Sequence, residues 1–356
     1  MKLRINKKTS FVLIVVFFLK NIDINAQDIH FSQFYTMPMY LNPANAGLDY
    51  DINAGIIYRQ QWKSVATPFN TYGMSISGRN NKKKKKGTIG AGFDCYYDKS
   101  GDAVFTSLTT GLCIAYHAKL NTKSKLSSGI KVNFNQKNIN NPNFQWGEQY
   151  DGQDYNASYS TGESLQNIQR TSFFDIAGGL NYKFQSGEKY MTANNRKIVD
   201  IGIAGFHLNR ANTALYSNYS DKQNSRYIAY FNGFFGVANS NLSILPKGYF
   251  QIQGGHKEFL AGVLFNVKTK DESKVTGFVT ASSFNLGILY RGKDAFIGVF
   301  QYEIKNYIVG ISYDINASKL TNASNGRGAY EISLRFINPN PFLRKGAHKN
   351  YGGSMF

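Results

Sequence analysis

Residues 306–315 read NYIVGISYDI, and residues 328–337 read GAYEISLRFI. In both stretches large apolar or aromatic residues occupy alternate positions, and most of the positions between them hold Asn, Gly, Ser, Asp, Glu or Arg. Alternation of this kind places the two sorts of side chain on opposite faces of a β-strand. The two stretches therefore predict two consecutive strands, each with one apolar and one polar face.

The same alternation recurs along most of the chain, for example over residues 126–135 and 172–184. Many runs last ten residues or more, whereas strands of soluble proteins average about five or six and a tilted membrane strand needs about 9–11. A soluble sandwich shows the same alternation with its apolar face turned inward, so strand length separates the two. The predicted strands cover residues 52–60, 69–79, 88–97, 103–117, 125–135, 172–184, 197–209, 226–238, 247–254, 257–268, 275–290, 294–302, 305–315 and 328–337.

Composition supports the same fold class. The chain has 24 Tyr, 27 Phe and 34 Gly but only 7 Pro, and aromatic residues suit a pleated surface while Pro removes a hydrogen-bond donor from it. Bacterial barrels usually have an even number of strands, with apolar side chains toward lipid and polar ones toward the lumen. The prediction is an all-β protein, a closed antiparallel transmembrane β-barrel of about 14 strands over residues 51–337.

The N-terminus predicts export. Basic residues precede an apolar run at 11–19, and Ile24-Asn25-Ala26 resembles a cleavage site, so residues 1–26 are predicted to be a signal peptide. The alternative, a membrane anchor, needs about twenty apolar residues. Residues 27–50 show no sustained period and are predicted to be an irregular leader or plug, and 338–356 a basic C-terminal tail.

The net charge of +19 predicts contact with outer-membrane lipid and lipopolysaccharide phosphates, or a basic lumen. Export argues against nucleic acid. The five histidines are scattered and no phosphate-binding or metal-binding motif occurs, so no enzyme, cofactor or metal site is predicted. The acids Asp175, Asp314 and Glu331 are expected to lie among Lys and Arg in the lumen, and Cys95 and Cys113 on opposite faces as free thiols.

Orientation follows from an assumption about the termini. If both are periplasmic, the three longest connections, 136–171, 210–225 and 316–327, face the cell exterior, which agrees with the usual short inner turns and long outer loops.

Two groups of motifs carry candidate functional residues. The first runs from QDIHFSQFY at 27–35 through YLNPANAG at 40–47 to YRQQW at 58–62, and the second runs from YRGKDA at 290–295 through YDINASKL at 313–320 to ASNGRGAYEISL at 323–334. The candidate residues, structural or partner-binding, are Asn42, Pro43, Ala44, Gly47, Arg59, Trp62, Tyr313, Asp314, Asn325, Gly326, Arg327, Gly328 and Glu331.

Residues 42–47 have turn chemistry, since Asn bonds its own backbone, Pro fixes φ and Gly tolerates left-handed geometry. This turn either leads into the first strand or belongs to a plug that moves when a client docks. Arg59 is expected to point into the lumen, where Glu331 or Asp314 could pair with it near the seam between the first and last strands. The turn at 324–328 either orders the last hairpin or touches a client.

In order and spacing these motifs resemble the PorP/SprF family of type IX secretion system membrane proteins over essentially the whole mature chain. The resemblance implies an outer-membrane barrel that works with the type IX secretion and gliding apparatus. It also implies partners, namely other secretion components and an exported surface protein, often an adhesin, received or anchored through its C-terminal sorting domain. The alternative is a porin or solute channel with a basic lumen; an outer-membrane enzyme is a third and more distant reading.

Overall fold

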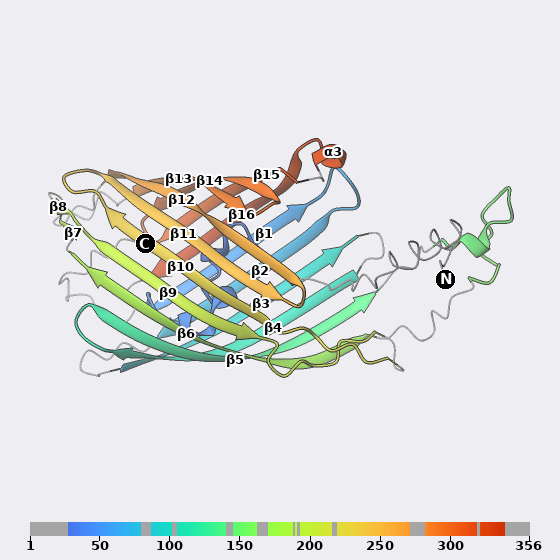
Figure 1. Cartoon of the computed structure of the whole chain (residues 1–356), viewed down its shortest axis with the longest axis horizontal. Helices are drawn as coiled ribbons and strands as arrows, with labels where there is room; N and C mark the ends of the chain where they lie inside the picture. Colours follow the sequence, from blue (N-terminus) through green and yellow to red (C-terminus); the bar gives the residue numbers. More distant parts are fainter. Residues whose placement is uncertain are drawn as a thin grey trace, which may run out of the picture.

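Fourteen strands of the chain close into a single barrel, seen from the side in the computed structural model of Figure 1. Each strand is antiparallel to its neighbours, and β1 pairs with β16 to close the sheet. The predicted fold class and strand count are confirmed. The structure describes residues 28–79, 87–101, 105–139, 145–161, 170–187, 189–190, 193–215, 219–270, 282–318 and 321–338.

Barrel neighbours follow chain order, except that a small separate hairpin, β7 (Lys189–Tyr190) and β8 (Ala193–Asn194), interrupts the path from β6 to β9. The barrel strands are β1 (Ile52–Gln61), β2 (Phe69–Arg79), β3 (Gly87–Ser100), β4 (Phe105–Lys119), β5 (Ser124–Ile139), β6 (Thr171–Ser186), β9 (Lys197–Phe206), β10 (Arg226–Gly236), β11 (Leu242–Gln253), β12 (His256–Lys270), β13 (Ser282–Arg291), β14 (Ala295–Ile304), β15 (Tyr307–Asn316) and β16 (Arg327–Asn338).

Several predicted strand boundaries were wrong, and β3 and β5, for example, end at Ser100 and Ile139 rather than at 97 and 135. β11 begins at Leu242 rather than 247, because Pro246 interrupts the sequence pattern but is tolerated where the pairing of β10 with β11 is irregular around Gly233. β9 ends at Phe206 rather than 209, because His207 takes a positive φ of 55° and leaves the strand. The predicted start of the strand at 275 lies outside the described residues.

The outer face of the barrel is apolar, as predicted. On β15, Ile311 is 51% exposed while the inward-facing Asp314 is 1% exposed. The two cysteines also follow the prediction: Cys113 is buried inside, Cys95 lies on the other face beside Met74, and both are free thiols. No helix in the part of the chain that the structure describes combines the length and the apolar character needed to cross a bilayer.

The inner face departs from the expected polar lumen. Inward positions on β12, β13 and β14 carry large aliphatic side chains that are at most 2% exposed: Leu260, Leu264, Leu289, Ile297 and Val299. They belong to one apolar cluster with Phe31 and Phe34, which come from the segment before β1. One half of the lumen therefore resembles the core of a soluble protein, because this half packs against protein and not against water.

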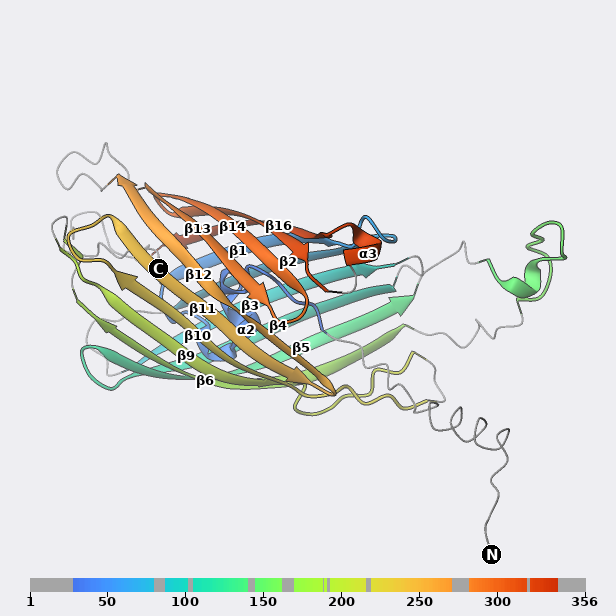
Figure 2. The same ribbon diagram turned by 45° about the horizontal axis from the view of Figure 1, so that its top comes forward.

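Residues 28–50, here called the lumenal segment, occupy the interior of the barrel (blue in Figures 1 and 2). The segment contains three short helices: η1 (Phe34–Thr36), α2 (Pro38–Leu41) and η2 (Pro43–Asn45). From Phe31 to Leu48 every residue of the segment except Pro38 is buried. The backbone N–H and C=O groups of this irregular segment are not all paired in a helix or sheet. The barrel wall supplies hydrogen-bond partners for some of them.

The two ends of the barrel differ. The loop end carries the long connections after β5, β9 and β15, and the tail end is where β1 begins and β16 ends. Asp28 lies at the loop end beside His207, whereas Asn338 lies at the tail end opposite Ile52. The lumenal segment therefore runs the length of the barrel before β1 starts, and the two ends of the chain themselves lie outside the described residues.

Two predicted segments cannot be compared with the structure. The predicted signal peptide at 1–26 and the predicted tail lie outside the described residues, except that Asn338, assigned to the tail, is the last residue of β16.

Candidate functional site

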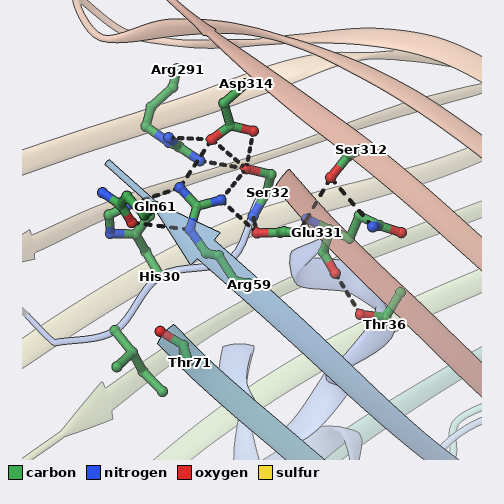
Figure 3. A network of polar contacts seen from close by, with 12 residues as sticks. His30, Ser32, Thr36, Arg59, Gln61, Thr71, Arg291, Ser312, Asp314 and Glu331 are labelled. Carbon is green, nitrogen blue, oxygen red and sulfur yellow. Dashed lines mark hydrogen bonds and ion pairs between the residues drawn. The ribbon is translucent and has the colours of Figure 1, made fainter. Parts of the chain in front are cut away.

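A buried cluster of four charged side chains lies in the lumen at the seam between the first and last strands (Figure 3). Arg59 of β1 contacts Glu331 of β16 at 2.7 Å and Asp314 of β15 at 3.0 Å. Arg291 of β13 contacts Asp314 at 3.0 Å. The ion pairs predicted between Arg59 and the two acids are confirmed.

Strand register explains why these residues meet. Arg59 and Glu331 are direct partners across the β1–β16 ladder, and Ser312 is opposite Glu331 on the other side. Direct partners share a face, so their side chains enter the lumen together. The two arginines balance the two carboxylates in an environment with almost no exposure, and this balance limits the cost of burying charge.

The cluster binds the lumenal segment through Ser32 and Gln33. The carboxylate of Glu331 accepts hydrogen bonds from the backbone N–H of Ser32 at 2.6 Å and of Gln33 at 2.8 Å. The Ser32 hydroxyl donates to Asp314 at 2.8 Å and accepts from Arg291 at 2.6 Å. Charged partners make these bonds stronger than neutral ones. Arg59 of β1 also donates to the Ser32 hydroxyl at 2.9 Å, so the cluster anchors the lumenal segment to four strands at once.

A second charged group holds the start of the lumenal segment at the loop end. His207 Nε2 lies 2.6 Å from the carboxylate of Asp28, and its Nδ1 lies 2.7 Å from Asp175 of β6. Arg226 of β10 approaches Asp28 at 3.5 Å. The expectation that Asp175 sits among Lys and Arg was wrong: its partners are His207 and the amides of Asn133 and Asn135, since the polar side chains of β5 face it.

The contact between Asp28 and His207 shifts the pKa of both side chains. Burial by itself lowers the pKa of His207, but the carboxylates of Asp28 and Asp175 outweigh burial and raise that pKa to about 9. Burial raises the pKa of Asp28, and the charges of His207 and Arg226 reverse this and hold it well below its usual value. At neutral pH the contact is therefore an ion pair.

The His207 contact predicts a pH dependence of stability. The pKa of His207 is higher in the folded protein than in the unfolded chain, so protonation of His207 stabilises the fold. This contribution is fully present below about pH 6.5 and is lost as the pH rises through about 9. We expect the free energy of unfolding in urea to fall between pH 7 and 10 for the wild type, and to fall less for His207→Gln, which carries no titrating group. Parallel pH profiles of the two proteins would contradict this assignment.

The middle of the lumenal segment is fixed by the predicted turn. The side chain of Asn42 donates to the backbone carbonyls of Leu180 at 2.8 Å and Ile203 at 3.1 Å, and its oxygen accepts from the N–H of Ala44 at 2.8 Å. Pro43 and Ala44 form η2, and Gly47 takes a positive φ of 67°. The candidate residues at 42–47 therefore seat the segment on β6 and β9.

The remaining candidate residues lie toward the loop end, on or near the turns that join β1 to β2 and β15 to β16. Trp62 follows β1 with a positive φ of 60°, donates its N–H to the carbonyl of Gly328 and packs on Phe69. Asn325 and Gly326 take positive φ angles after α3 (Thr321–Ser324) and turn the chain into β16. These contacts close the last hairpin. Arg327 is exposed, and Tyr313 is on the outer face.

Several residues of the site were missed by sequence reasoning. They are Asp28, Ser32, Gln33, His207, Arg226 and Arg291. The first three lie in a stretch without periodicity, and the others are single polar residues at strand ends. For Asp28, Ser32, Gln33 and Arg291 the one available signal was their presence within the motifs, and His207 and Arg226 lie outside the motifs.

The chemistry of the site is that of attachment. The carboxylates of Asp314 and Glu331 are neutralised by arginine and accept hydrogen bonds from Ser32 and Gln33 of the lumenal segment. Within the described residues no group of three or more His, Cys, Asp or Glu side chains could hold a metal ion.

A closed barrel with an apolar outer face and its own chain packed in the lumen defines a transmembrane barrel protein of an outer membrane. The chain belongs to the family described as type IX secretion system membrane protein PorP/SprF, which it matches over residues 24–336. It is accordingly an outer-membrane component of type IX secretion. This family is one of secretion-system membrane proteins and not an enzyme family.

Solved structures similar to this chain are also barrels of outer membranes. BamA from Haemophilus ducreyi lacking POTRA domains 1–3 has 10% identity and a TM-score of 0.37, with 81% of this chain and 70% of that chain covered. A FadL homologue from Pseudomonas aeruginosa has 9% identity and a TM-score of 0.39, with 80% and 89% covered. The beta domain of the Bordetella autotransporter BrkA has 7% identity and a TM-score of 0.35, with 81% and 99% covered. No curated protein matches the chain.

Proposed function

We propose that this barrel receives or anchors an exported surface protein, of the adhesin kind, through the C-terminal sorting domain of that protein. Membership of a type IX secretion family supports a role with exported proteins and with other components of the secretion and gliding apparatus. The observation that carries the proposal is the filled lumen. A barrel of a secretion system whose interior is occupied by its own chain acts by binding rather than by conducting.

The filled lumen also argues against the alternative of a porin or solute channel. In an open pore the inward-facing side chains would be wet, whereas here Arg59, Asn285, Gln301 and Glu331 are at most 1% exposed. The charge cluster is balanced, so it offers no anion-selective lining. A cavity of about 100 Å³ lies between the lumenal segment and the wall near Tyr35 and Lys247, and its size is that of a few water molecules.

Single-channel recording tests this reading. The purified protein in a planar bilayer is expected to show no steady open-state conductance, because the lumenal segment packs against the apolar side chains of β12 to β14 inside the barrel. A general porin reconstituted from the same detergent is the control for insertion. A stable, reproducible open level from the wild-type barrel would favour the solute channel.

Surface display tests the anchoring role. Deleting the gene is expected to remove a large exported protein from the cell surface, and expression of the intact barrel is expected to restore it. Copurification of that protein with the barrel through its C-terminal domain alone would locate the contact. Unchanged display after deletion would contradict the proposal.

We further propose that residues 1–26 are removed after Ala26 on export. The mature chain would then start at Gln27, one residue before Asp28. Mass spectrometry of the N-terminal peptide of the purified barrel checks the cleavage position. Recovery of a peptide from residues 1–26 would contradict it.

A further inference from the structure

The long connection between β5 and β6 contains a small folded unit, residues 145–161, here called the tyrosine loop. It includes η3 (Gly147–Gln149) and a β-bridge between Tyr150 and Tyr155, and it turns at Gly152 with a φ of +96°. In both views it stands beyond the loop end of the barrel (green, at the right of Figures 1 and 2). The unit therefore presents a surface that the barrel wall does not cover.

The tyrosine loop has its own polar core. The side chain of Gln149 is 4% exposed, donates to the backbone carbonyls of Ala157 at 3.2 Å and Tyr159 at 3.1 Å, and accepts from the hydroxyl of Tyr155 at 3.1 Å. The carboxylate of Asp151 accepts from the N–H groups of Gln153 and Asp154, each at 2.8 Å. A loop held in this way loses little conformational entropy when a partner binds it.

Tyrosine rings and carboxylates dominate the exposed surface of this unit. Tyr150 is 56% exposed, Tyr155 39% and Tyr159 46%. Residues 145–161 contain Glu148, Asp151 and Asp154 but no Lys, Arg or His, in a chain whose net charge is +19. The tyrosine loop is thus an acidic, aromatic surface on a strongly basic protein.

We propose that the tyrosine loop is a docking surface for a partner protein that presents arginine and lysine side chains. A cation is attracted to the face of an aromatic ring and pairs with carboxylates, and arginine does both with one planar group. Tyrosine is enriched at protein interfaces because it offers a large contact area with few rotatable bonds. The positive charge elsewhere on this chain repels such a partner, so the tyrosine loop is where it docks.

The charge also argues against two other occupants. Lipopolysaccharide phosphates are repelled by the three carboxylates, and a neutral glycan gains nothing from them although it can stack on tyrosine. The inference rests on the proposed function only for the origin of the partner, an exported protein. The surface itself is tested with purified components.

The probe is a fluorescein-labelled octa-arginine peptide, titrated by fluorescence anisotropy against the barrel in nanodiscs of zwitterionic lipid. Two double variants leave the Gln149 and Asp151 contacts intact: Tyr150→Ala with Tyr159→Ala removes two rings, and Glu148→Gln with Asp154→Asn removes two charges. Each double variant is expected to bind the peptide about tenfold more weakly. Binding to the wild type is expected to weaken as salt is raised.

The matched control is Tyr219→Ala, which removes a 72% exposed tyrosine from the connection between β9 and β10 and is expected to leave the affinity unchanged. Equal affinities for the wild type and both double variants would overturn the proposal. So would binding of a neutral core oligosaccharide in place of the peptide.

Failure of the proposed function is distinguishable from failure of this inference. Loss of surface display on gene deletion, together with equal peptide affinities for all variants, would keep the anchoring role and overturn the docking surface. Unchanged display on gene deletion, together with the expected loss of peptide binding in both double variants, would do the reverse.

Discussion

Replacing Arg59 by methionine is expected to lower the free energy of unfolding of the barrel by about 3–5 kcal/mol. The side chain is 1% exposed and neutralises Asp314 and Glu331 at hydrogen-bonding distance. Methionine fills much of the same volume but leaves Arg291, among the residues of the cluster, to neutralise two buried carboxylates. The cost is that of an uncompensated buried charge rather than of the pair itself.

A double variant separates charge from packing. Adding Glu331→Gln to Arg59→Met removes the orphaned charge, so we expect the double variant to be more stable than Arg59→Met alone. Arg327→Met is the matched control, because Arg327 is exposed at the loop end, and its effect should stay within about 0.5 kcal/mol. Urea unfolding in detergent micelles measures all three. Equal stability of Arg59→Met and the wild type would show that the cluster does not hold the seam.

Replacing Gly129 by valine is expected to destabilise the barrel by about 3 kcal/mol, at the upper end of the usual cost of overpacking. A Cβ at this inward position of β5 would lie 2.5 Å from Ala44 N and from the carbonyl carbon of Pro43. These are backbone atoms of η2, which Asn42 ties to β6 and β9. Neither the strand nor the short helix can move away without breaking hydrogen bonds.

The control for Gly129 is Gly298→Val on β14, where an added Cβ meets nothing within 4 Å. There the substitution is expected to be neutral or mildly stabilising, since glycine weakens a strand and this position faces outward. Limited proteolysis supplies a second readout, because a displaced η2 exposes the bonds near residues 43–45. A Gly129→Val protein as stable and as protected as Gly298→Val would mean that the turn does not pack on β5.

The two substitutions bear on function through the lumenal segment. Arg59 holds the segment near its loop end and Gly129 accommodates its middle. If the barrel acts by binding, either variant should reduce the surface display of the exported partner in proportion to the loss of folded barrel. Neither should create a solute channel while the apolar half of the lumen remains packed.

Much of the architecture was predictable from sequence because it depends on a local repeat. Lipid imposes the same apolar requirement on every outward position, so alternation marked the outward face of strands such as β15 and β16, and the strand count followed. The same face assignment put Arg59, Asp314 and Glu331 together inside. Since Arg59 and Glu331 are direct neighbours across the β1–β16 seam, they were the expected ion pair.

What fills the barrel was decided only by the tertiary structure. Ser32 bonds to Glu331 across 299 positions of the chain, and Asp28 meets His207 across 179. No local period marks such pairs, because they form between an aperiodic segment and whichever wall residues lie opposite it once the barrel has closed. The apolar lining of β12 to β14 has the same origin. Those strands are apolar on both faces because one face meets lipid and the other packs against the lumenal segment.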